Sequence, residues 1–340
     1  MRFGLGWRPE LGAGIFANLD RIAVVEVLAE ELFGADAAQR RAMRFLRTQV
    51  PVVLHATSLG LASTERVDAR RLDAVARVIG WLEPELWSEH LAFVRAGGTE
   101  IGHLAAPPRT DATLEGLARN VAEARRVTGS MPLLENVASL VEPPGSTYSE
   151  YEWLHAVPYD LLLDLHNLYA NAVNFGFDAA AVVRSLPASR IKAVHLAGGR
   201  RIERGRVLDD HLHPVPDAVF DLFALVRGDA TVILERDGQY PPIEDLLEEL
   251  ERASRVTAVM DDTPIAALPS RGSSEAVSLE TLAKLYTDEA ALEAFLADPR
   301  TEVDRDDLRL AFRSFARKRL NAQQCRESHG PGPRRMPATE

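Results

Sequence analysis

The stretch Leu161-Leu162-Leu163-Asp164 places three leucines directly before a carboxylate, and seven other short apolar runs of the chain close in a comparable way. A run that is apolar at every position is typical of a strand buried on both faces, as in a parallel sheet. The other runs close in a polar, metal-capable or turn residue, and they are Leu5-Gly6-Trp7-Arg8, Val24-Val25-Glu26, Val52-Val53-Leu54-His55, Leu86-Trp87-Ser88-Glu89-His90, Leu133-Leu134-Glu135-Asn136, Val194-His195 and Val232-Ile233-Leu234-Glu235. Helix-length segments separate the runs. The sequence therefore predicts an α/β fold of eight βα units, which is a (β/α)8 TIM barrel.

The barrel pattern covers residues 1–260, and the composition then changes. The linking helices are predicted from the apolar periodicity over 36–48, 67–82, 113–128, 148–156 and 242–255. Residues 261–277 have the composition of a linker. Ser278 is a candidate N-cap with leucines and phenylalanines at helical spacing behind it, so we expect a helical extension over 278–320. Residues 321–340 have the composition of a disordered tail.

Composition and charge argue against several classes of protein. No apolar stretch approaches the ~20 residues that span a bilayer, and no signal-peptide pattern precedes the first strand. We therefore expect a cytoplasmic protein with no membrane association. The single cysteine, Cys325, leaves no disulfide framework and no thiolate metal site. The net charge of -11 argues against nucleic acid as a partner, since such proteins usually carry a basic face.

Metal-capable side chains concentrate where a barrel of this kind has its active site, at the carboxyl ends of the strands. Carboxylates packed this closely would repel one another unless cations neutralised them. Nitrogen and oxygen donors without sulfur suit zinc, manganese or iron. Glu135 lies in the middle of the set and is well placed to bridge two metal ions. The set comprises Glu135, Asp164 and Glu235 with six of the nine histidines, namely His55, His90, His166, His195, His211 and His213.

The loop over 199–216 carries the strongest local signal. Asp209 and His211 stand two positions apart on an extended segment, so both can ligate one ion. We expect His213 to contact a metal-binding side chain and orient it, without binding the metal ion itself. Glu26 and Glu89 are weaker candidates, and Glu89 should point toward the helices if His90 points inward. Four asparagines at the same mouth are either turn residues or polar groups of the site: Asn136, Asn167, Asn171 and Asn174.

At these residues the chain resembles a known family, the DUF692 (UPF0276) proteins, also called multinuclear non-heme iron-dependent oxidative enzymes. The resemblance runs from Gly4 to about Val256. It implies a barrel similar to that of xylose isomerase, with two or three irons bound at its mouth. The matching stretches are 88–93, 133–136, 163–178, 194–198, 209–217 and 234–237.

The resemblance also implies a ligand set for each iron. His55, His90 and Glu135 would hold the first iron, with Glu135 bridging to a second that is held by Asp164, His195 and Glu235. Asp209 and His211, together with Asn167 or His166, would hold a third. The catalytic residues so implied are Glu135, Asp164, His195 and Glu235. One departure concerns the third site, because many members read Asp-Val-Asn-Asn where this chain has Asp164-Leu165-His166-Asn167.

The function implied by the resemblance is the modification of a ribosomally made precursor peptide, most often at cysteine, by a mixed-valent iron pair with O2 as co-substrate. A partner protein that binds the leader peptide is also implied. The alternative is a metal-dependent hydrolase or sugar isomerase on the same kind of barrel. An isomerase should offer a catalytic lysine at the mouth, and Lys192 is the only lysine of the barrel. Metal storage is a further alternative. The helical extension is expected either to bind a peptide or partner, or to pack on the barrel.

Overall fold

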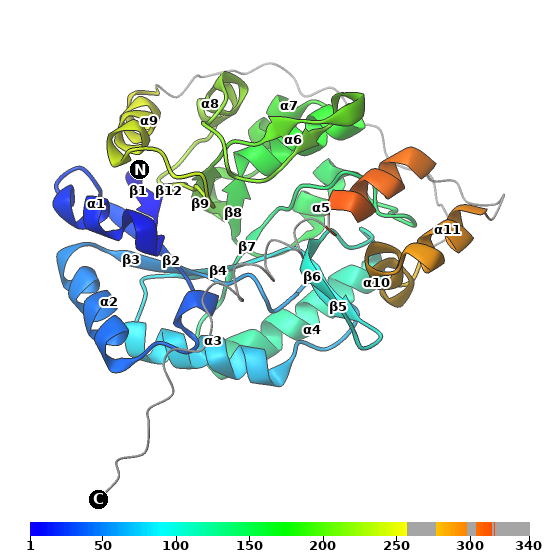
Figure 1. Ribbon diagram of the computed structural model, residues 1–340, viewed down its shortest axis with the longest axis horizontal. Coiled ribbons are helices and arrows are strands. Elements are labelled where there is room, and N and C mark those ends of the chain that lie inside the picture. The colour runs from blue at the N-terminus through cyan, green and yellow to red at the C-terminus, as the bar shows by residue number, and fades with distance from the viewer. Residues whose placement is uncertain (257–276, 298–303, 315, 317–340) are drawn as a thin grey trace, which may run out of the picture.

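The computed structural model describes residues 1–256, 277–297, 304–314 and 316, and its centre is a closed barrel of eight parallel strands (Figure 1). Each of the eight predicted runs overlaps one of these strands, so the (β/α)8 prediction is confirmed. Around the barrel the strands follow the order β1-β12-β9-β8-β7-β4-β3-β2. They are β1 (Arg2–Gly6), β2 (Val24–Leu28), β3 (Val52–His55), β4 (Trp87–His90), β7 (Leu133–Glu135), β8 (Leu161–Asp164), β9 (Ile191–Leu196) and β12 (Thr231–Leu234).

Helices form a layer around the barrel (Figure 1). They are α1 (Gly12–Ala17), α2 (Ala37–Gln49), α3 (Ala69–Leu82), α4 (Asp111–Thr128), α5 (Glu150–Ala156), α6 (Leu165–Phe175), α7 (Ala179–Ser185), α8 (Asp217–Phe223) and α9 (Ile243–Arg255), with 3-10 turns at Pro9–Leu11, Glu30–Leu32, Ala188–Arg190 and Glu203–Gly205. Side chains fix several helix starts. Asp36 accepts the backbone N–H groups of Ala38 and Gln39, and Ser149 forms a capping box with Glu152. Each such cap stabilises a helix by about 1 kcal/mol.

The barrel interior has an apolar floor. Alternate residues of a strand point to the same side of the sheet, so a barrel is filled in layers. The main core lies between the strands and the surrounding helices. Two smaller buried clusters occupy the interior of the barrel, one of Val24, Val53 and Ile233 and one of Leu133, Leu162 and Ala193. This floor leaves the carboxyl-terminal half of the interior for other side chains.

Two antiparallel hairpins rise beside the mouth of the barrel. The first joins β5 (Phe93–Ala96) to β6 (Thr99–Ala105), and the second joins β10 (Arg200–Arg201) to β11 (Val207–Leu208). The second hairpin belongs to the predicted long loop over 199–216. Both hairpins follow the carboxyl end of a barrel strand, where insertions shape the active site of this fold.

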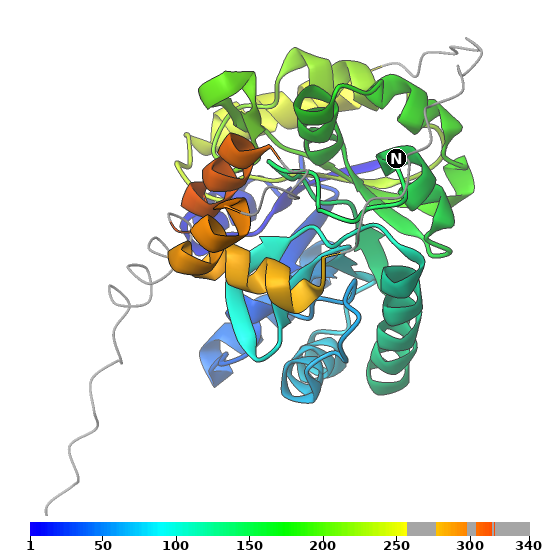
Figure 2. The same cartoon turned by 90° about the vertical axis from the view of Figure 1, so that its right-hand side faces the viewer.

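The C-terminal extension packs against the first hairpin (Figure 2). It contains α10 (Leu279–Thr287), α11 (Glu289–Ala297) and a helix over 305–314. Its leucines share a second core with the hairpin, where Leu282, Leu285 and Leu308 meet Phe93 and Ile101. The tail predicted over 321–340 and all of the predicted linker except its last residue lie outside the described residues. In the part of the chain that the structure describes, no helix is both long enough and apolar enough to cross a membrane.

Asn120 of α4 ties the loop between β3 and α3 to the barrel, and its loss should destabilise the fold. Its buried amide donates to the carbonyl oxygens of Leu61, Ser63 and Glu65 and accepts the N–H of Val67. Because each buried group left without a partner costs about 1–3 kcal/mol, Asn120→Ala should lower the melting temperature by several degrees. The exposed Glu115→Ala on the same helix is the matched control. Equal melting temperatures for the two variants would show that the loop does not depend on Asn120.

Candidate metal centre

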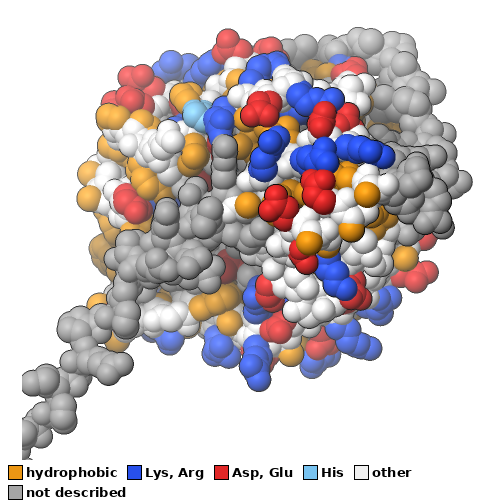
Figure 3. All heavy atoms as spheres, turned by 45° about the vertical axis from the view of Figure 1, so that its right-hand side comes forward, with side chains coloured by type: hydrophobic (Ala, Val, Ile, Leu, Met, Phe, Trp, Pro, Cys, Tyr) orange, Lys and Arg blue, Asp and Glu red, His pale blue; other side chains and the backbone are white. Residues whose placement is uncertain are grey.

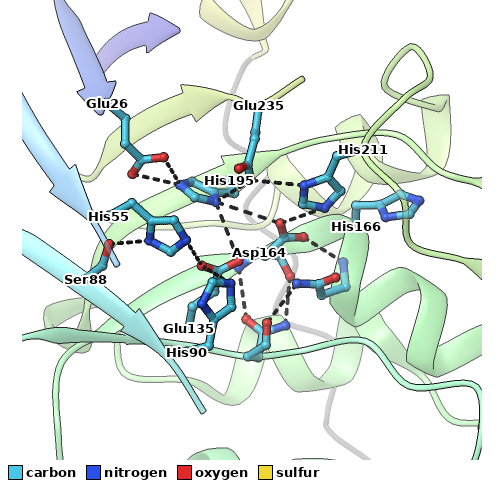
Figure 4. A network of polar contacts seen from close by, with 12 residues as sticks. Glu26, His55, Ser88, His90, Glu135, Asp164, His166, His195, His211 and Glu235 are labelled. Carbon is cyan, nitrogen blue, oxygen red and sulfur yellow. Dashed lines mark hydrogen bonds and ion pairs between the residues drawn. The ribbon is translucent and has the colours of Figure 1, made fainter. Parts of the chain in front are cut away.

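A layer of seven polar side chains lies at the carboxyl ends of the barrel strands, and Figure 4 labels all of them. Six of these seven residues follow a residue of the apolar floor by two positions in the sequence. Because side chains alternate along a strand, each of the six points into the barrel, as its partner in the floor does. Because the strands are parallel, their carboxyl ends meet at one rim. Alternation therefore brings the layer together, and its members are Glu26, His55, His90, Glu135, Asp164, His195 and Glu235.

The first group of donor atoms surrounds one oxygen of Glu135. His55 Nε2 lies 3.4 Å and His90 Nε2 3.3 Å from Glu135 Oε2. The outer ring nitrogens have other partners. His55 Nδ1 is 2.8 Å from Ser88 Oγ, and His90 Nδ1 is 3.4 Å from Glu89 Oε1. Both imidazoles are thus held with Nε2 toward the centre. Ligand atoms around a metal ion bound at about 2 Å stand about 3 Å apart, which matches this group.

A second group surrounds His195 Nδ1. Glu235 Oε2 lies 3.1 Å, Glu135 Oε1 3.6 Å and Asp164 Oδ2 4.0 Å from that nitrogen. The other ring nitrogen, Nε2, lies 3.0 Å from Glu26. A carboxylate on the far ring nitrogen is the usual way to orient a metal-binding histidine. Because Glu135 directs Oε2 at the first group and Oε1 at the second, it has the geometry of a bridging ligand.

His211 extends the centre toward the mouth. Its Nδ1 lies 3.1 Å from Glu235 Oε2, and its Nε2 lies 2.7 Å from Asp209 Oδ1 and 3.6 Å from Asp164 Oδ2. The backbone of His211 has a φ of 52°, a left-handed conformation that is costly for a residue with a side chain. The carbonyl of His211 accepts the N–H of Asp237, which helps to hold this conformation.

His166 meets the same cluster through one nitrogen. Its Nδ1 lies 2.7 Å from Asp209 Oδ1, while its Nε2 accepts the backbone N–H of Gly199 at 2.8 Å. A side chain at Gly199 would approach the His166 ring to 2.5 Å, so glycine is required there. Only Nδ1 of His166 therefore remains available to a metal ion. The neighbouring Asn167 has a buried Oδ1 with no hydrogen-bond partner.

The four asparagines and His213 were also predicted for this site, and three of the asparagines hold the backbone around it through hydrogen bonds. Asn136 exchanges two hydrogen bonds with the backbone of Asp164. Asn171 and Asn174 bond backbone groups of the loops at 137–139 and 207. His213 is not brought into the cluster. Its Nε2 lies 3.7 Å from Asp210, and its side chain is 34% exposed.

Two residues of the site received no firm role from sequence. Glu26 orients His195. Its position two residues after Val24, which belongs to the apolar floor, could have indicated from the sequence that Glu26 points into the barrel. Arg8 is buried and donates to Glu235 Oε1 at 3.2 Å and to Asp237. It thereby leaves Oε2 of Glu235 to face the histidines. Glu89 accepts the N–H groups of Leu59 and His90, on the outer side of β4 as expected.

The charges of the centre are balanced by protons in the absence of a metal ion. Burial raises the pKa of Asp164 to about 7, and the charge of His211 offsets only part of that effect. Burial by itself lowers the pKa of His90, but the carboxylates of Glu135 and Glu89 outweigh it and raise that pKa to about 9. The pKa of His195 is likewise raised well above its usual value by Glu26 and Glu135, against the effect of burial. A divalent cation would replace these protons as the counter-charge.

The donor set fits a metal cluster. Glu135 Oε2, Asp164 Oδ2 and His195 Nδ1 are fully buried, face the centre and make no hydrogen bond. Among the residues that the structure describes, five overlapping groups of three side chains each bring one donor atom per residue within 4.8 Å of the others. Buried polar atoms without partners are rare in proteins, and a bound ion often supplies the missing partner. The arrangement can hold more than one ion, since neighbouring groups share Glu135, Asp164, His195, Glu235 and His211.

A cavity of about 400 Å³ opens from this centre. Its lower part is lined by His55, His90, Asn167, His211 and Glu235. The volume lies within the range of small-molecule sites, about 300–1,000 Å³. On the face shown in Figure 3, side chains of both charges are interspersed, and no continuous basic patch of the kind that binds nucleic acid is seen there.

Comparisons with known proteins agree on the family. A family model described as RiPP precursor modification enzyme MbnB/TglH/ChrH, where RiPP denotes a ribosomally made and later modified peptide, matches residues 2–258. A UPF0276 protein of Streptomyces avermitilis is 37% identical over 262 residues, covering 73% of this chain and 53% of that protein, so the chain spans about half of that relative. A UPF0276 protein of Anaeromyxobacter is 35% identical over 263 residues, covering 75% of this chain and 92% of that protein.

A solved structure shares the fold. It is a xylose isomerase-like TIM barrel/4-hydroxyphenylpyruvate dioxygenase fusion protein, with a TM-score of 0.50 and 12% identity over 80% of this chain and 47% of that chain. The family model and the relatives confirm the resemblance found in the sequence. The chain belongs to the MbnB/TglH/ChrH family of RiPP precursor modification enzymes.

Proposed function

We propose that this enzyme holds two or three iron ions and uses O2 to modify one residue, a cysteine, of a ribosomally made precursor peptide. The observation that carries the proposal is the set of overlapping donor groups at the mouth of the barrel, within a family that modifies such peptides. His55, His90 and Glu135 would hold one ion. Asp164, His195 and Glu235 would hold the second, with Glu135 shared between the two.

A third ion would lie nearest the opening, between Asp209 and His211. Asn167 Oδ1 supports this position, because it is buried and has no hydrogen-bond partner. His166 could add only Nδ1, because its Nε2 accepts the N–H of Gly199. The third site is therefore the one whose occupancy depends most on the loop over 199–216.

Bound iron would supply the one-electron chemistry with O2 that no protein side chain provides. The chain itself orients the ligands. Glu26 keeps Nδ1 of His195 toward the centre, and Arg8 restrains one oxygen of Glu235. The barrel lacks cysteine, so a thiol that reaches the metals would come from the substrate. The cavity above the centre, of about 400 Å³, has room for a short peptide segment.

The isomerase alternative is disfavoured by the position of Lys192. That lysine is exposed and lies near the start of β9, away from the carboxyl-terminal rim where the donors gather. No lysine lines the cavity in the described part of the chain. A metal-dependent hydrolase uses a similar donor set, so the identity of the metal separates it from the proposed oxidase.

The remaining parts of the proposal concern partners and location. The precursor peptide is the substrate, and a protein that binds its leader segment is the expected partner. Both belong in the cytoplasm, where ribosomally made precursors arise.

Metal content is the first test of the proposal. Protein purified without oxygen should carry two or three irons per chain, because the donor groups form a shared cluster. Glu135→Gln should lose more iron than Asp209→Asn, since a bridging ligand supports two ions. The exposed Glu85→Gln serves as the control, and elemental analysis is the measurement. Stoichiometric zinc, with no activity gained on iron loading, would favour the hydrolase.

Proton release on metal binding is the second test. At about pH 8, below the pKa of about 9 of His90, that imidazole must lose a proton before Nε2 can bind an ion. Adding Fe2+ to metal-free protein in weak buffer should therefore acidify the solution, as read by an indicator dye. Metal affinity should fall as the pH is lowered, because protons then compete more strongly. His90→Gln should release fewer protons than the wild type, whereas His155→Gln, outside the site, should match it. Metal uptake without acidification would contradict the protonated network.

Dependence on O2 is the third test. Iron-loaded enzyme, incubated with a cysteine-bearing precursor peptide and a mild reductant, should change the peptide mass at one residue. Mass spectrometry with and without O2 gives the result. Glu235→Gln should abolish the change, because it removes a charged ligand. The same change at full rate without O2 would contradict the oxidative mechanism.

A further inference from the structure

The cavity above the metal centre has a wall that does not belong to the barrel. Ala311 and Ser314 line it, and both lie on the helix over 305–314 of the C-terminal extension. Three residues apart, they occupy one face of that helix. His103 and Leu104 of β6 line the same cavity. A segment of substrate that reaches the metals through this cavity therefore lies beside the extension.

The extension is seated firmly on one side of the mouth. Leu282 and Tyr286 of α10 are fully buried in the core shared with the first hairpin. At the turn of that hairpin, a side chain on Gly97 would approach Glu280 Cγ to 2.3 Å, so α10 and the turn pack with no room between them. The extension is thus part of the same folded unit as the hairpin that borders the cavity.

Ion pairs hold the extension on the other side of the mouth. Asp307 is 3% exposed, pairs with Arg204 at 2.8 Å and also contacts Arg206, both from the second hairpin. Asp304 adds a contact to Arg204 at 2.8 Å. Removing one partner of a buried pair is costly, because a charge is then left uncompensated. The helix over 305–314 therefore spans from one hairpin to the other.

The helix contributes both to the core and to the cavity. Leu308, Leu310 and Ala311 are buried in the shared core and anchor the helix. Ala311 and Ser314, the two that line the cavity, are small and leave its volume open. Ser314 is partly exposed, so a larger side chain there would extend into the cavity that it lines.

We propose that the helix over 305–314 is the specificity-determining wall of the peptide channel, so that the residues next to the modified cysteine lie against Ala311 and Ser314. This inference rests on the proposed function, because it takes a cysteine-bearing peptide as the occupant. The cavity of about 400 Å³ fits a few residues of extended chain and excludes a folded protein.

The test compares a small thiol with a peptide thiol on the full chain. The protein is loaded with Co2+, and thiolate binding is read from the thiolate-to-cobalt absorption band. The probes are 2-mercaptoethanol and the nonapeptide Gly-Ala-Gly-Ala-Cys-Ala-Gly-Ala-Gly. Ser314→Trp should weaken nonapeptide binding by about tenfold or more, because the indole overfills the channel, and leave 2-mercaptoethanol binding unchanged. Ser314→Leu should act in the same direction with a smaller loss.

The control places the same indole at an exposed position of the same helix. Arg313 is exposed, and its ion pair with Glu203 at 3.6 Å lies on the surface and contributes little, so Arg313→Trp should leave both probes bound as in the wild type. Cobalt content and melting temperature are measured for every variant. Nonapeptide affinity within about twofold of wild type in Ser314→Trp would overturn the inference. Equal loss of both probes in Ser314→Trp and Ser314→Leu would do the same, because a wall that selects by size cannot act on the small thiol. Wild-type protein that binds neither thiol would instead overturn the chemistry at cysteine, and this inference with it.

Discussion

The burial of several carboxylates at one end of a barrel is the constraint on which the rest of this structure depends. Glu26, Glu135, Asp164 and Glu235 are each at most 5% exposed, and they lie within one polar layer. Bringing such charges out of water without partners costs several kcal/mol for each ion. Histidines of the same layer lie among the carboxylates and supply positive charge as long as they are protonated. Bound cations would neutralise the carboxylates in the same way, and the side chains of this layer would be their ligands.

The layer arises from strand alternation. The residues that fill the floor and those that form the centre are two positions apart on the same strands, as Val53 and His55 of β3 show. The apolar residues keep the barrel closed beneath the site, and their rigidity positions the donors above. Around them a ring of further contacts aims each ligand, with Ser88 behind His55 and Glu26 behind His195. The apolar floor thus contributes to the stability of the barrel, while the side chains of the polar layer are available to bind metal ions.

Much of the fold and of the site could be predicted from the sequence, because both depend on local patterns. The apolar runs located the strands, and the residue that closes each run located most of the donors. Contacts between distant segments could not be predicted in this way. The choice of nitrogen on His166 depends on Gly199, and the role of Arg8 depends on Asp237, at the opposite end of the barrel sequence. His213 has the same spacing from His211 as His211 has from Asp209, yet the left-handed turn at His211 carries it away from the cluster.

The extension adds a part that the barrel alone does not have, since it closes one side of the mouth between two hairpins. The proposed metal centre depends on Glu135 as the bridge between two metal ions. A crystal structure of iron-loaded protein, measured at the iron absorption edge, tests it most directly. We expect at least two anomalous peaks, of which one lies beside His55 and His90 and one beside His195, about 3.5–4 Å apart, with Glu135 touching both. A single peak, or two peaks that do not share Glu135, would contradict it.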